Sequence, residues 1–545
     1  MHGGEFFYAP RTDASALCSG RVKQNPLHLR DAILWAVAAL AISLVFSAAV
    51  LRGLGPSSDV WDYSQEARQL ERGEGFTSLY TYPVHLGPED QPPFPVRWRM
   101  PLHAVRGAIA LRMGFPLPEA FLVAGAQAHA FLVAFVFLLG AHLHSRRAGA
   151  IAAACALDCP FFLDVYSVGL NVAPAAALGL AVWLLLLRGK GLVTAILASI
   201  GAAACWYLRG ETLLLAPVWA WAASSGREGV TWKRGAVFLA AFAALCAPWL
   251  IALTASTGSA APIRGNPMLL YTPEYPGYAS SRGYGVAIPG VLEYLLAHPV
   301  SFAFRWAKDI VGFGLDFLTG LGPIAVGLAM AGLLLREPRD RYAWLKPALP
   351  FLAAIAIQMA AFAALERSPR FLVPVVPLAC VMVGIAGAPA LDRLCGRRMV
   401  LALFALLLLE RGATVAFQTR EATRRAPAMP RETLVALKPL AAAWPKQALL
   451  LTDTPDWAAW HLDRPALLLP LHRDLDPLLR DHEVAAIFLS PYARGRNATD
   501  GDTAWVGIQD RAEALPGFRG PEMLPGGARL YVREPLARSE AVGTK

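Results

Sequence analysis

Long apolar segments alternate with short polar segments over residues 32–417. A run of about 17–25 apolar residues is long enough to cross a bilayer as an α-helix. Runs of this kind, each predicted to span a membrane, cover residues 32–51, 119–142, 148–163, 169–187, 191–208, 211–225, 235–255, 320–335, 347–365, 371–390 and 399–417. The pattern therefore predicts an all-α polytopic membrane module of about 11 transmembrane helices.

The two ends of the chain have a different pattern. Residues 1–31 are polar and form a separate N-terminal segment, while residues 418–545 contain no further spanning run and are richer in Asp, Arg and Pro. Within this tail, Ala448–Thr452, Val484–Ser490 and Leu530–Val532 are typical of short strands bounded by turn-forming residues. The tail is therefore predicted to fold as a small C-terminal α/β domain outside the membrane.

The distribution of Lys and Arg predicts the orientation of the spans. If the N-terminus is cytoplasmic, the inner connections hold fourteen Lys and Arg residues, whereas the three short outer connections hold only Arg209, Arg367 and Arg370. Positively charged residues collect on the cytoplasmic side of membrane proteins. The loops 52–118 and 256–319 and the tail are therefore predicted to face outward.

The composition supports a membrane protein and argues against two other classes of site. The chain is 56% hydrophobic and 17% charged, against roughly 25% charged residues in soluble domains. Its formal net charge of +10 comes from short clusters between apolar runs, not from a basic stripe with interleaved aromatic residues, so a nucleic-acid partner is not expected. Cys155 and Cys159 are one helical turn apart without a neighbouring His or further Cys, so packing is expected rather than a metal site.

The longest polar interruption in the N-terminal half is Ser57–Leu102. Within it, Asp59, Asp62 and Glu66 recur at helical spacing, so one short helix can present several acidic groups on one face. The segment then enters a Pro-rich, Arg-bearing stretch, Pro92–Pro101. Carboxylates followed by guanidinium groups suit the handling of a sugar and a phosphate together. The alternative is a solvated loop with ordinary surface charges.

Four short motifs resemble a known family. The residues from Asp59 to Phe76 read D-x-x-D-Y-x-x-x-A-x-x-L-x-x-G-E-G-F and resemble the first outer loop of the GT-C superfamily of polyprenyl-phosphate-dependent glycosyltransferases. The bacterial relatives of protein O-mannosyltransferases and of the lipid A aminoarabinose transferase, which are of the family 39 type, are the most similar in layout. Arg99–Leu102, Leu208–Glu211 and Glu366–Leu372 are similar to three later motifs of these enzymes.

The resemblance implies a transferase that moves a sugar from a polyprenyl-phosphate carrier to an acceptor at the outer face of the bacterial inner membrane, with inversion. It assigns the general base to Asp59 and a supporting role to Asp62. It implies that the donor phosphate binds outer-face guanidinium groups, for which the candidates are Arg97, Arg99, Arg209 and Arg367.

Each of these residues also has a plain structural explanation. Asp59 is suited to cap the helix that it begins. Arg209 and Glu211 suit a polar turn between two spans, and Arg367 beside Glu366 suits a surface ion-pair cluster.

The chain departs from the family at the second acidic position. Asp164 lies near it, but Asn171 stands where the acid is expected, so either residue is a candidate for the second site group. The lack of a clear second carboxylate argues against a bound divalent cation, and no metal or other cofactor is predicted. In the second outer loop, Tyr271, Tyr275 and Arg282 are candidates for an acceptor pocket or lid, although tyrosines also anchor loops at the membrane surface.

Two other functional classes remain open at this point. A lipid or sugar transporter or flippase also has many spans and intramembrane arginines, but such folds often contain two matching halves, and the Asp59 loop has no second copy. A non-catalytic scaffold with a partner-binding tail is the other alternative. For a transferase, the expected partners are membrane lipids, the polyprenyl-phosphate sugar and a glycan, lipid or protein acceptor, and the sequence does not distinguish these acceptors or name the sugar.

Overall fold

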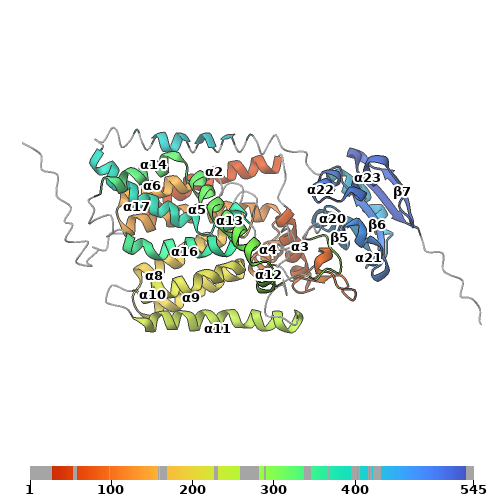
Figure 1. Ribbon diagram of the computed structural model, residues 1–545, viewed down its shortest axis with the longest axis horizontal. Coiled ribbons are helices and arrows are strands. Elements are labelled where there is room, and N and C mark those ends of the chain that lie inside the picture. The colour runs from red at the N-terminus through yellow and green to blue at the C-terminus, as the bar shows by residue number, and fades with distance from the viewer. Residues whose placement is uncertain are drawn as a thin grey trace, which may run out of the picture.

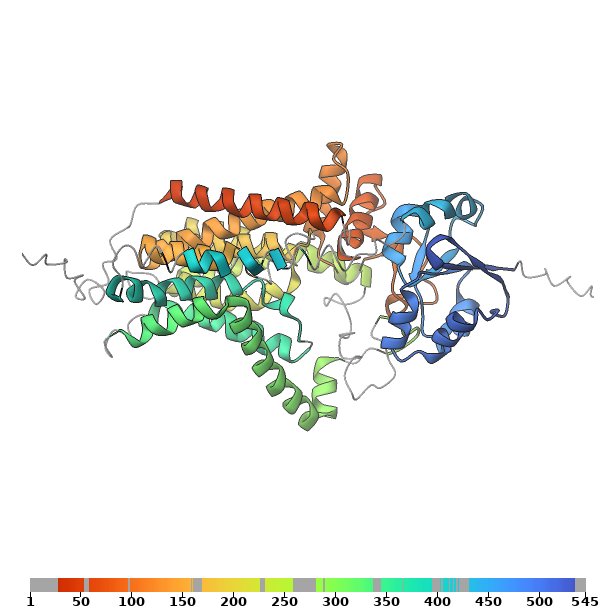
Figure 2. The same cartoon turned by 90° about the horizontal axis from the view of Figure 1, so that it is seen from above.

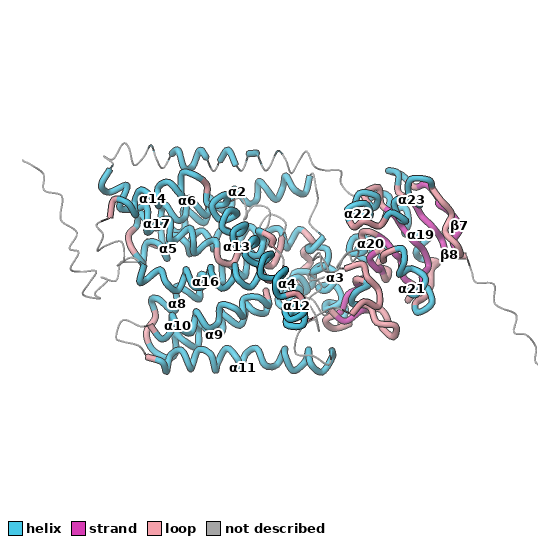
Figure 3. The backbone as a smooth tube through the Cα atoms, in the orientation of Figure 1, coloured by secondary structure: helices cyan, strands magenta, loops and turns pink. Residues whose placement is uncertain are grey.

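The computed structural model describes residues 28–52, 58–96, 99–157, 159, 169–225, 231–257, 281–287, 290–336, 345–365, 367–394, short stretches between 402 and 420, and 431–534. The described part has two regions along its long axis. Helices fill one end, a small sheet with short helices forms the other, and helices α3 and α4 lie between them (Figures 1 and 3). The first outer loop therefore joins the helical region to the C-terminal domain.

The helical region packs around the first half of the chain. Its helices are α2 (Leu29–Arg52), α5 (Glu119–Leu143), α6 (Arg146–Leu157), α8 (Val172–Arg188), α9 (Gly191–Leu208), α10 (Ala216–Ser224), α11 (Trp232–Thr257), α13 (Pro299–Leu321), α14 (Pro323–Leu334), α16 (Leu345–Ala363) and α17 (Val376–Leu394). The most completely buried side chains come from α5, α6, α8 and α17, so these helices form the centre of the bundle.

Among the described residues, four helices are long and apolar enough to cross a membrane: α2, α5, α9 and α11. A fifth span is obtained if α13 and α14, which meet at a bend of 98°, are counted together, and Figure 2 shows α13 leaving the bundle at an angle. The expected number of about 11 spans is thus not confirmed. Of the other predicted spans, 148–163 is described as a helix only as far as Leu157, and 211–225 is divided between the 3-10 turn η2 (Gly210–Leu215) and α10. The predicted span 399–417 is described only in part, over 402, 405–410, 412–414 and 416–417.

The first outer loop is ordered into several short elements. They are α3 (Ser58–Arg72), β1 (Thr77–Ser78), β2 (Tyr80–Thr81), the 3-10 turn η1 (Pro83–His85), β3 (Phe94–Pro95) and α4 (Pro101–Arg112). Strands β1 and β3 pair antiparallel and return the chain from α3 towards α4. The predicted helix carrying Asp59, Asp62 and Glu66 is therefore confirmed as α3.

The C-terminal domain is an α/β fold, as predicted. Its strands are β4 (Leu449–Thr452), β5 (Ala466–Leu468), β6 (Val484–Leu489), β7 (Phe518–Met523) and β8 (Arg529–Arg533). Its helices and 3-10 turns are α19 (Arg431–Ala442), α20 (Pro455–Leu462), η5 (His472–Asp474), α21 (Leu475–Asp481), α22 (Ala493–Thr499), α23 (Thr503–Arg511) and η6 (Pro525–Gly527). The strands β4, β6 and β8 correspond to the three strand segments predicted from the sequence.

The sheet has a member that sequence reading did not identify. Its order is β2-β5-β4-β6-β8-β7, so strand β2 of the first outer loop forms one edge. Tyr80 pairs with Ala466 and Thr81 with Leu467 in parallel register. Because backbone hydrogen bonds join the two segments, the Asp59 loop and the C-terminal domain share one sheet.

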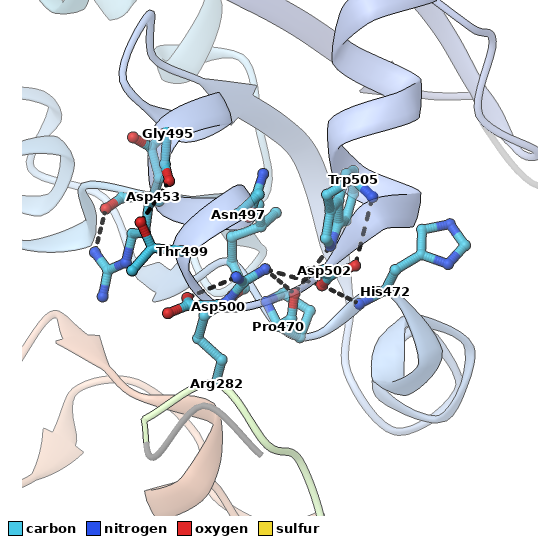
Figure 4. Close-up of polar contacts among 12 residues, drawn as sticks. Arg282, Asp453, Pro470, His472, Gly495, Asn497, Thr499, Asp500, Asp502 and Trp505 are labelled. Atoms are coloured by element: carbon cyan, nitrogen blue, oxygen red, sulfur yellow. Dashed lines mark hydrogen bonds and ion pairs between the residues drawn. The ribbon is translucent and has the colours of Figure 1, made fainter. Parts of the chain in front are cut away.

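The second outer loop also reaches the C-terminal domain. Residues 281–287 precede helix α12 (Val291–Ala297). The buried Arg282 guanidinium donates to the backbone oxygens of Leu469 at 2.9 Å and Pro470 at 3.0 Å, and to the carboxylates of Asp500 at 2.8 Å and Asp502 at 3.2 Å. Figure 4 shows this side chain pointing from its loop into the domain. The second outer loop is therefore fastened to the domain at this point.

Candidate active site

Helix α3 lies close to α4 and the bundle. Its Val60, Tyr63 and Ala67 side chains are buried in the bundle core. A Cβ atom at Gly107 of α4 would lie 2.8 Å from the Ala67 Cβ atom and 2.5 Å from the Phe121 ring. The two helices can approach this closely because Gly107 has no side chain. The packed face of α3 fixes the direction in which its acidic face points.

One guanidinium group bridges the two predicted carboxylates. Arg99 Nη2 donates to Asp59 Oδ1 at 2.5 Å, and Arg99 Nε donates to Asp62 Oδ2 at 2.7 Å. The guanidinium also lies over the Tyr63 ring, 5.0 Å from its centre. Asp62 is buried, whereas the Asp59 side chain keeps 24% of its surface exposed. Of the two acids, Asp59 is the one that a substrate can reach.

A second guanidinium group approaches Asp59 from another part of the chain. Arg370 lies on the 3-10 turn η4 (Pro369–Leu372), and its Nη1 atom is 3.6 Å from Asp59 Oδ2. The predicted candidate Arg367, three residues earlier, is engaged elsewhere: it makes two hydrogen bonds to Asp316 of α13, at 3.0 and 2.7 Å. The structure therefore brings Arg370, rather than Arg367, to Asp59.

Arg209 and Asn171 form a separate polar group. Arg209 lies between α9 and the 3-10 turn η2 (Gly210–Leu215), where its Nε atom donates to the Glu211 carboxylate. Its Nη1 atom donates to Asn171 Oδ1 at 3.3 Å, and Asn171 Nδ2 donates to the Leu208 carbonyl at 2.5 Å. Asn171 thus contacts the predicted phosphate-binding arginine and holds its guanidinium in one orientation.

The charges around Asp59 favour its ionised form. Burial alone raises the pKa of this carboxyl, but Arg99, Arg370 and Arg209 outweigh that effect, and the net pKa lies below its usual value. Glu66 behaves in the opposite way, because burial and the neighbouring Asp62 raise its pKa well above the ordinary value. One face of α3 therefore carries two carboxyl groups whose pKa values are shifted in opposite directions.

The C-terminal domain contributes one more acid to this region. Asp456 of α20 is buried, and its Oδ2 atom has no hydrogen-bond partner among the described residues. Burial, followed by the charge of Asp62, raises the pKa of Asp456 to about 7. Glu66 is likewise buried, beside the Asp62 carboxyl group. Asp456 was not a candidate from the sequence. It lies far from α3 along the chain, and no local pattern indicates that the two segments are in contact.

Helix α20 docks on α3 through aromatic and charged groups. The Trp61 ring lies 4.8 Å from the Trp457 ring and 5.8 Å from the Trp460 ring, measured between centres. Arg68 donates to the backbone oxygens of Ala459 at 2.9 Å and Trp460 at 3.0 Å. The Ala459 oxygen also accepts the Asp463 backbone N–H at 3.1 Å, so Arg68 adds a second donor there and a donor to Trp460 in the last turn of α20. The contacts place the domain directly beside the acidic face of α3.

Four predicted site residues cannot be placed, and one lies elsewhere. Arg97, Asp164, Tyr271 and Tyr275 fall outside the described residues. The buried Arg282 makes its hydrogen bonds within the C-terminal domain. Across the described ranges, no group of three or more His, Cys, Asp or Glu side chains is arranged to hold a metal ion.

The chain was compared with known proteins at three levels. No protein-family model matches it, and no curated protein sequence does. Among solved structures, ArnT from Cupriavidus metallidurans bound to undecaprenyl phosphate has a TM-score of 0.54 at 12% identity, over 94% of this chain and 99% of that chain. The same protein in the apo state gives 0.52 at 13% identity, over 91% of this chain and 97% of that chain.

A mycobacterial arabinofuranosyltransferase, AftD, has a TM-score of 0.50 at 16% identity, over 91% of this chain and 41% of that chain. These neighbours are GT-C glycosyltransferases, so the chain has the GT-C fold, as the sequence motifs predict.

Proposed function

We propose that this chain is a glycosyltransferase that moves a sugar from a polyprenyl-phosphate-linked donor to an acceptor hydroxyl at the outer face of a bacterial inner membrane. The observation that carries the proposal is the environment of Asp59. This partly exposed carboxylate lies beside the guanidinium groups of Arg99 and Arg370 within a GT-C fold. The solved neighbour ArnT, which has this fold, binds undecaprenyl phosphate.

Asp59 is the proposed general base. A hydroxyl group is a weak nucleophile until a carboxylate within hydrogen-bond reach takes its proton during bond formation. In the proposed step, the acceptor oxygen bonds to the anomeric carbon, its proton passes to Asp59, and the bond from that carbon to the phosphate oxygen breaks. One displacement without a covalent enzyme intermediate inverts the anomeric centre. Asp62, which is hydrogen-bonded to Arg99, supports the base indirectly.

The leaving polyprenyl phosphate requires cations where its charge develops. Arg370 and Arg209 are the proposed phosphate-binding residues, since both act electrostatically on Asp59 from different elements. Arg99 adds positive charge but is held between two carboxylates, and Arg97 remains a candidate. We assign Arg367 a structural role. Its guanidinium group is paired with Asp316 and packs so closely against Gly312 that a Cβ atom at that position would collide with it. Asn171 is proposed to orient Arg209.

The proposed orientation follows the distribution of positive charges. The N-terminus is placed in the cytoplasm, and the Asp59 loop and C-terminal domain on the outer side, as an acceptor in the cell envelope requires. The acceptor is a glycan, lipid or protein hydroxyl. Tyr271, Tyr275 and Asp164 remain candidates for its binding, and no metal ion is assigned to the reaction.

The test uses purified full-length protein with a panel of radiolabelled polyprenyl-phosphate sugars and envelope acceptors. Asp59→Asn is expected to reduce turnover by about 10²–10⁴-fold, because the base is lost, while undecaprenyl phosphate binding is retained. Glu71→Gln is the matched control, since Glu71 is an exposed acid on the same helix. Equal turnover by Asp59→Asn and the wild type would remove Asp59 as the base. Binding without turnover of any donor, with acceptors present, would favour a transporter.

A further inference from the structure

Both carboxylate oxygens of Asp59 face guanidinium groups. Oδ1 accepts a hydrogen bond from Arg99 at 2.5 Å, and Oδ2 lies 3.6 Å from Arg370 Nη1. An ionised carboxylate is an acceptor only, and its lone pairs are oriented by the donors that occupy them. In this arrangement, an acceptor hydroxyl would have to compete with two cations for the base.

The two guanidinium groups are held very differently. Arg99 is 21% exposed, makes two short hydrogen bonds to Asp59 and Asp62, and lies over the Tyr63 ring. Arg370 is 42% exposed, and its separation from Asp59 is too long for a hydrogen bond. Arg99 is therefore held in place by its hydrogen bonds. Arg370 makes no hydrogen bond to Asp59, so moving it away from Asp59 breaks only a long ion pair.

The backbone that carries Arg370 is nevertheless anchored on both sides. Arg367 pairs with Asp316 through two hydrogen bonds, and the Phe371 ring stacks on the Phe362 ring with centres 4.2 Å apart. The turn η4 is thus fixed, while the Arg370 guanidinium lies over the Phe371 ring, 5.1 Å from its centre, and its side chain stays 42% exposed. A guanidinium group on a fixed base with an exposed end can move between two neighbouring anions.

We propose that Arg370 transfers from Asp59 to the donor phosphate when the donor binds, so that the donor itself frees Oδ2 of Asp59 to accept the acceptor proton. Arg370 is thereby a positioning residue for the base as well as a phosphate ligand. This inference rests on the proposed transferase function. It makes the base available only when a donor is present.

The electrostatics of the site agree with such an exchange. A phosphate offers the Arg370 fork two parallel hydrogen bonds in place of one long contact. The groups acting on Asp59 are Arg99, Arg370 and Arg209 on its cationic side, with Asp62 and Glu66 along its own helix. Arg99 stays shared with Asp62, so removing Arg370 weakens the cationic field, raises the pKa of Asp59 and makes it a stronger base.

The experiment measures the titration of Asp59 without turnover. Carbodiimide labelling, read by peptide mass spectrometry across pH, gives the midpoint of Asp59 protonation in the full-length wild type and in Arg370→Gln, each with and without undecaprenyl phosphate. Without lipid, Arg370→Gln is expected to titrate at a pH about one unit higher than the wild type, because one cation is missing. With lipid bound, the two midpoints are expected to coincide, because Arg370 has left Asp59 in the wild type.

The comparison separates the exchange from a simple effect of the phosphate charge, which raises both midpoints alike. Midpoints that stay apart by the same interval after lipid binds would overturn the exchange and leave the proposed function standing. A wild type that does not bind undecaprenyl phosphate would overturn both. Arg112→Gln, at an exposed position of α4, is the matched control, and its Asp59 midpoints are expected to follow the wild type. Arg370→Lys retains the positive charge, so it tests whether the shift in the Asp59 midpoint requires the loss of that charge.

Discussion

The two ends of helix α3 are built on different principles. At its C-terminal end, Arg68 and Arg72 dock the C-terminal domain: Arg72 pairs with both carboxylate oxygens of Asp463, at 2.9 and 3.0 Å, and Arg68 donates to two backbone oxygens of α20. Between Ser58 and Glu66, Asp59 shares Arg99 with Asp62, and Glu66 is buried beside Asp62.

Arginines therefore dock the domain at one end of the helix and carboxyl groups gather at the other, where the Trp61 ring also packs against α20. At the docked end, the guanidinium groups of Arg68 and Arg72 have oxygen acceptors on the domain, and removing such a partner from a buried group costs about 1–3 kcal/mol. Excess carboxyl groups at the other end carry such a cost and shift pKa values, which is typical of functional sites. The contacts of Arg68 and Arg72 therefore fix the position of α3, and this position places the carboxyl groups at the other end of the helix.

Removal of Arg99 should affect the acidic end most strongly. In Arg99→Ala, Asp59 and Asp62 lose the donor that they share, so the orientation of the proposed base and a positive charge near the proposed phosphate site are both lost. We expect turnover to fall by about 10²–10³-fold, as for the loss of one preorganised donor. Initial rates with a labelled donor measure the effect. Arg112→Ala, at an exposed position of α4, is the control and should remain near the wild-type rate; an unchanged rate in folded Arg99→Ala would show that the bridge has no role.

Removal of Arg68 should instead loosen the docked end. Arg68 is 14% exposed and lies over the Trp460 ring at 4.6 Å. Arg68→Ala removes this contact, the donor to the Trp460 carbonyl and one of the two donors to the Ala459 carbonyl. We expect the free energy of opening of α20 and β5 to fall by about 2–3 kcal/mol, measured by amide hydrogen exchange. Arg72→Ala is the matched comparison: its pair with Asp463 is exposed and should contribute about 0.5 kcal/mol. Equal losses in the two variants would contradict this account of the interface.

Several elements could be predicted from local sequence alone. Helix α3, with Asp59, Asp62 and Glu66 on it, follows from helical spacing, and strands β4, β6 and β8 follow from their apolar runs between turn formers. Strand β2 could not be predicted in this way, because it has two residues and forms only by pairing with β5, far along the chain.

The same limit applies to individual site residues. Arg367 and Arg370 are equivalent in sequence terms, since they are three residues apart in one motif. Their roles differ because Asp316 on α13 takes Arg367 and leaves Arg370 to Asp59. Arg282 was a candidate for an acceptor lid, but its partners Asp500 and Asp502 are more than two hundred residues away. The role of each of these arginines is set by contacts that form only in the folded protein.

The smallest expected effect concerns Asp456, where the domain meets the acidic end of α3. Asp62 of α3, Tyr80 and Tyr82 near strand β2, and Arg496 of α22 act electrostatically with it. Its pKa is raised from 3.8 to about 7, chiefly by burial. The docked domain therefore binds a proton more tightly than the opened domain, and docking should weaken as the pH rises from about 4 to about 7 and stay weakened above that.

Asp456→Asn removes the charge that forms in this pH range. At pH 8 the variant should dock more tightly than the wild type by about 1–2 kcal/mol, less than the full ~1.4 kcal/mol per pKa unit because opening and hydration relieve part of the penalty. At pH 4 the two proteins should be equal, since the wild-type carboxyl is then protonated when docked. Hydrogen exchange of α20, corrected for intrinsic rates, measures both values, with the exposed Asp476→Asn as control. A gain in docking free energy that is the same at both pH values would mean that Asp456 acts through its shape or its hydrogen bonds. It would also mean that the carboxyl groups of Asp62 and Asp456 interact only weakly across the interface.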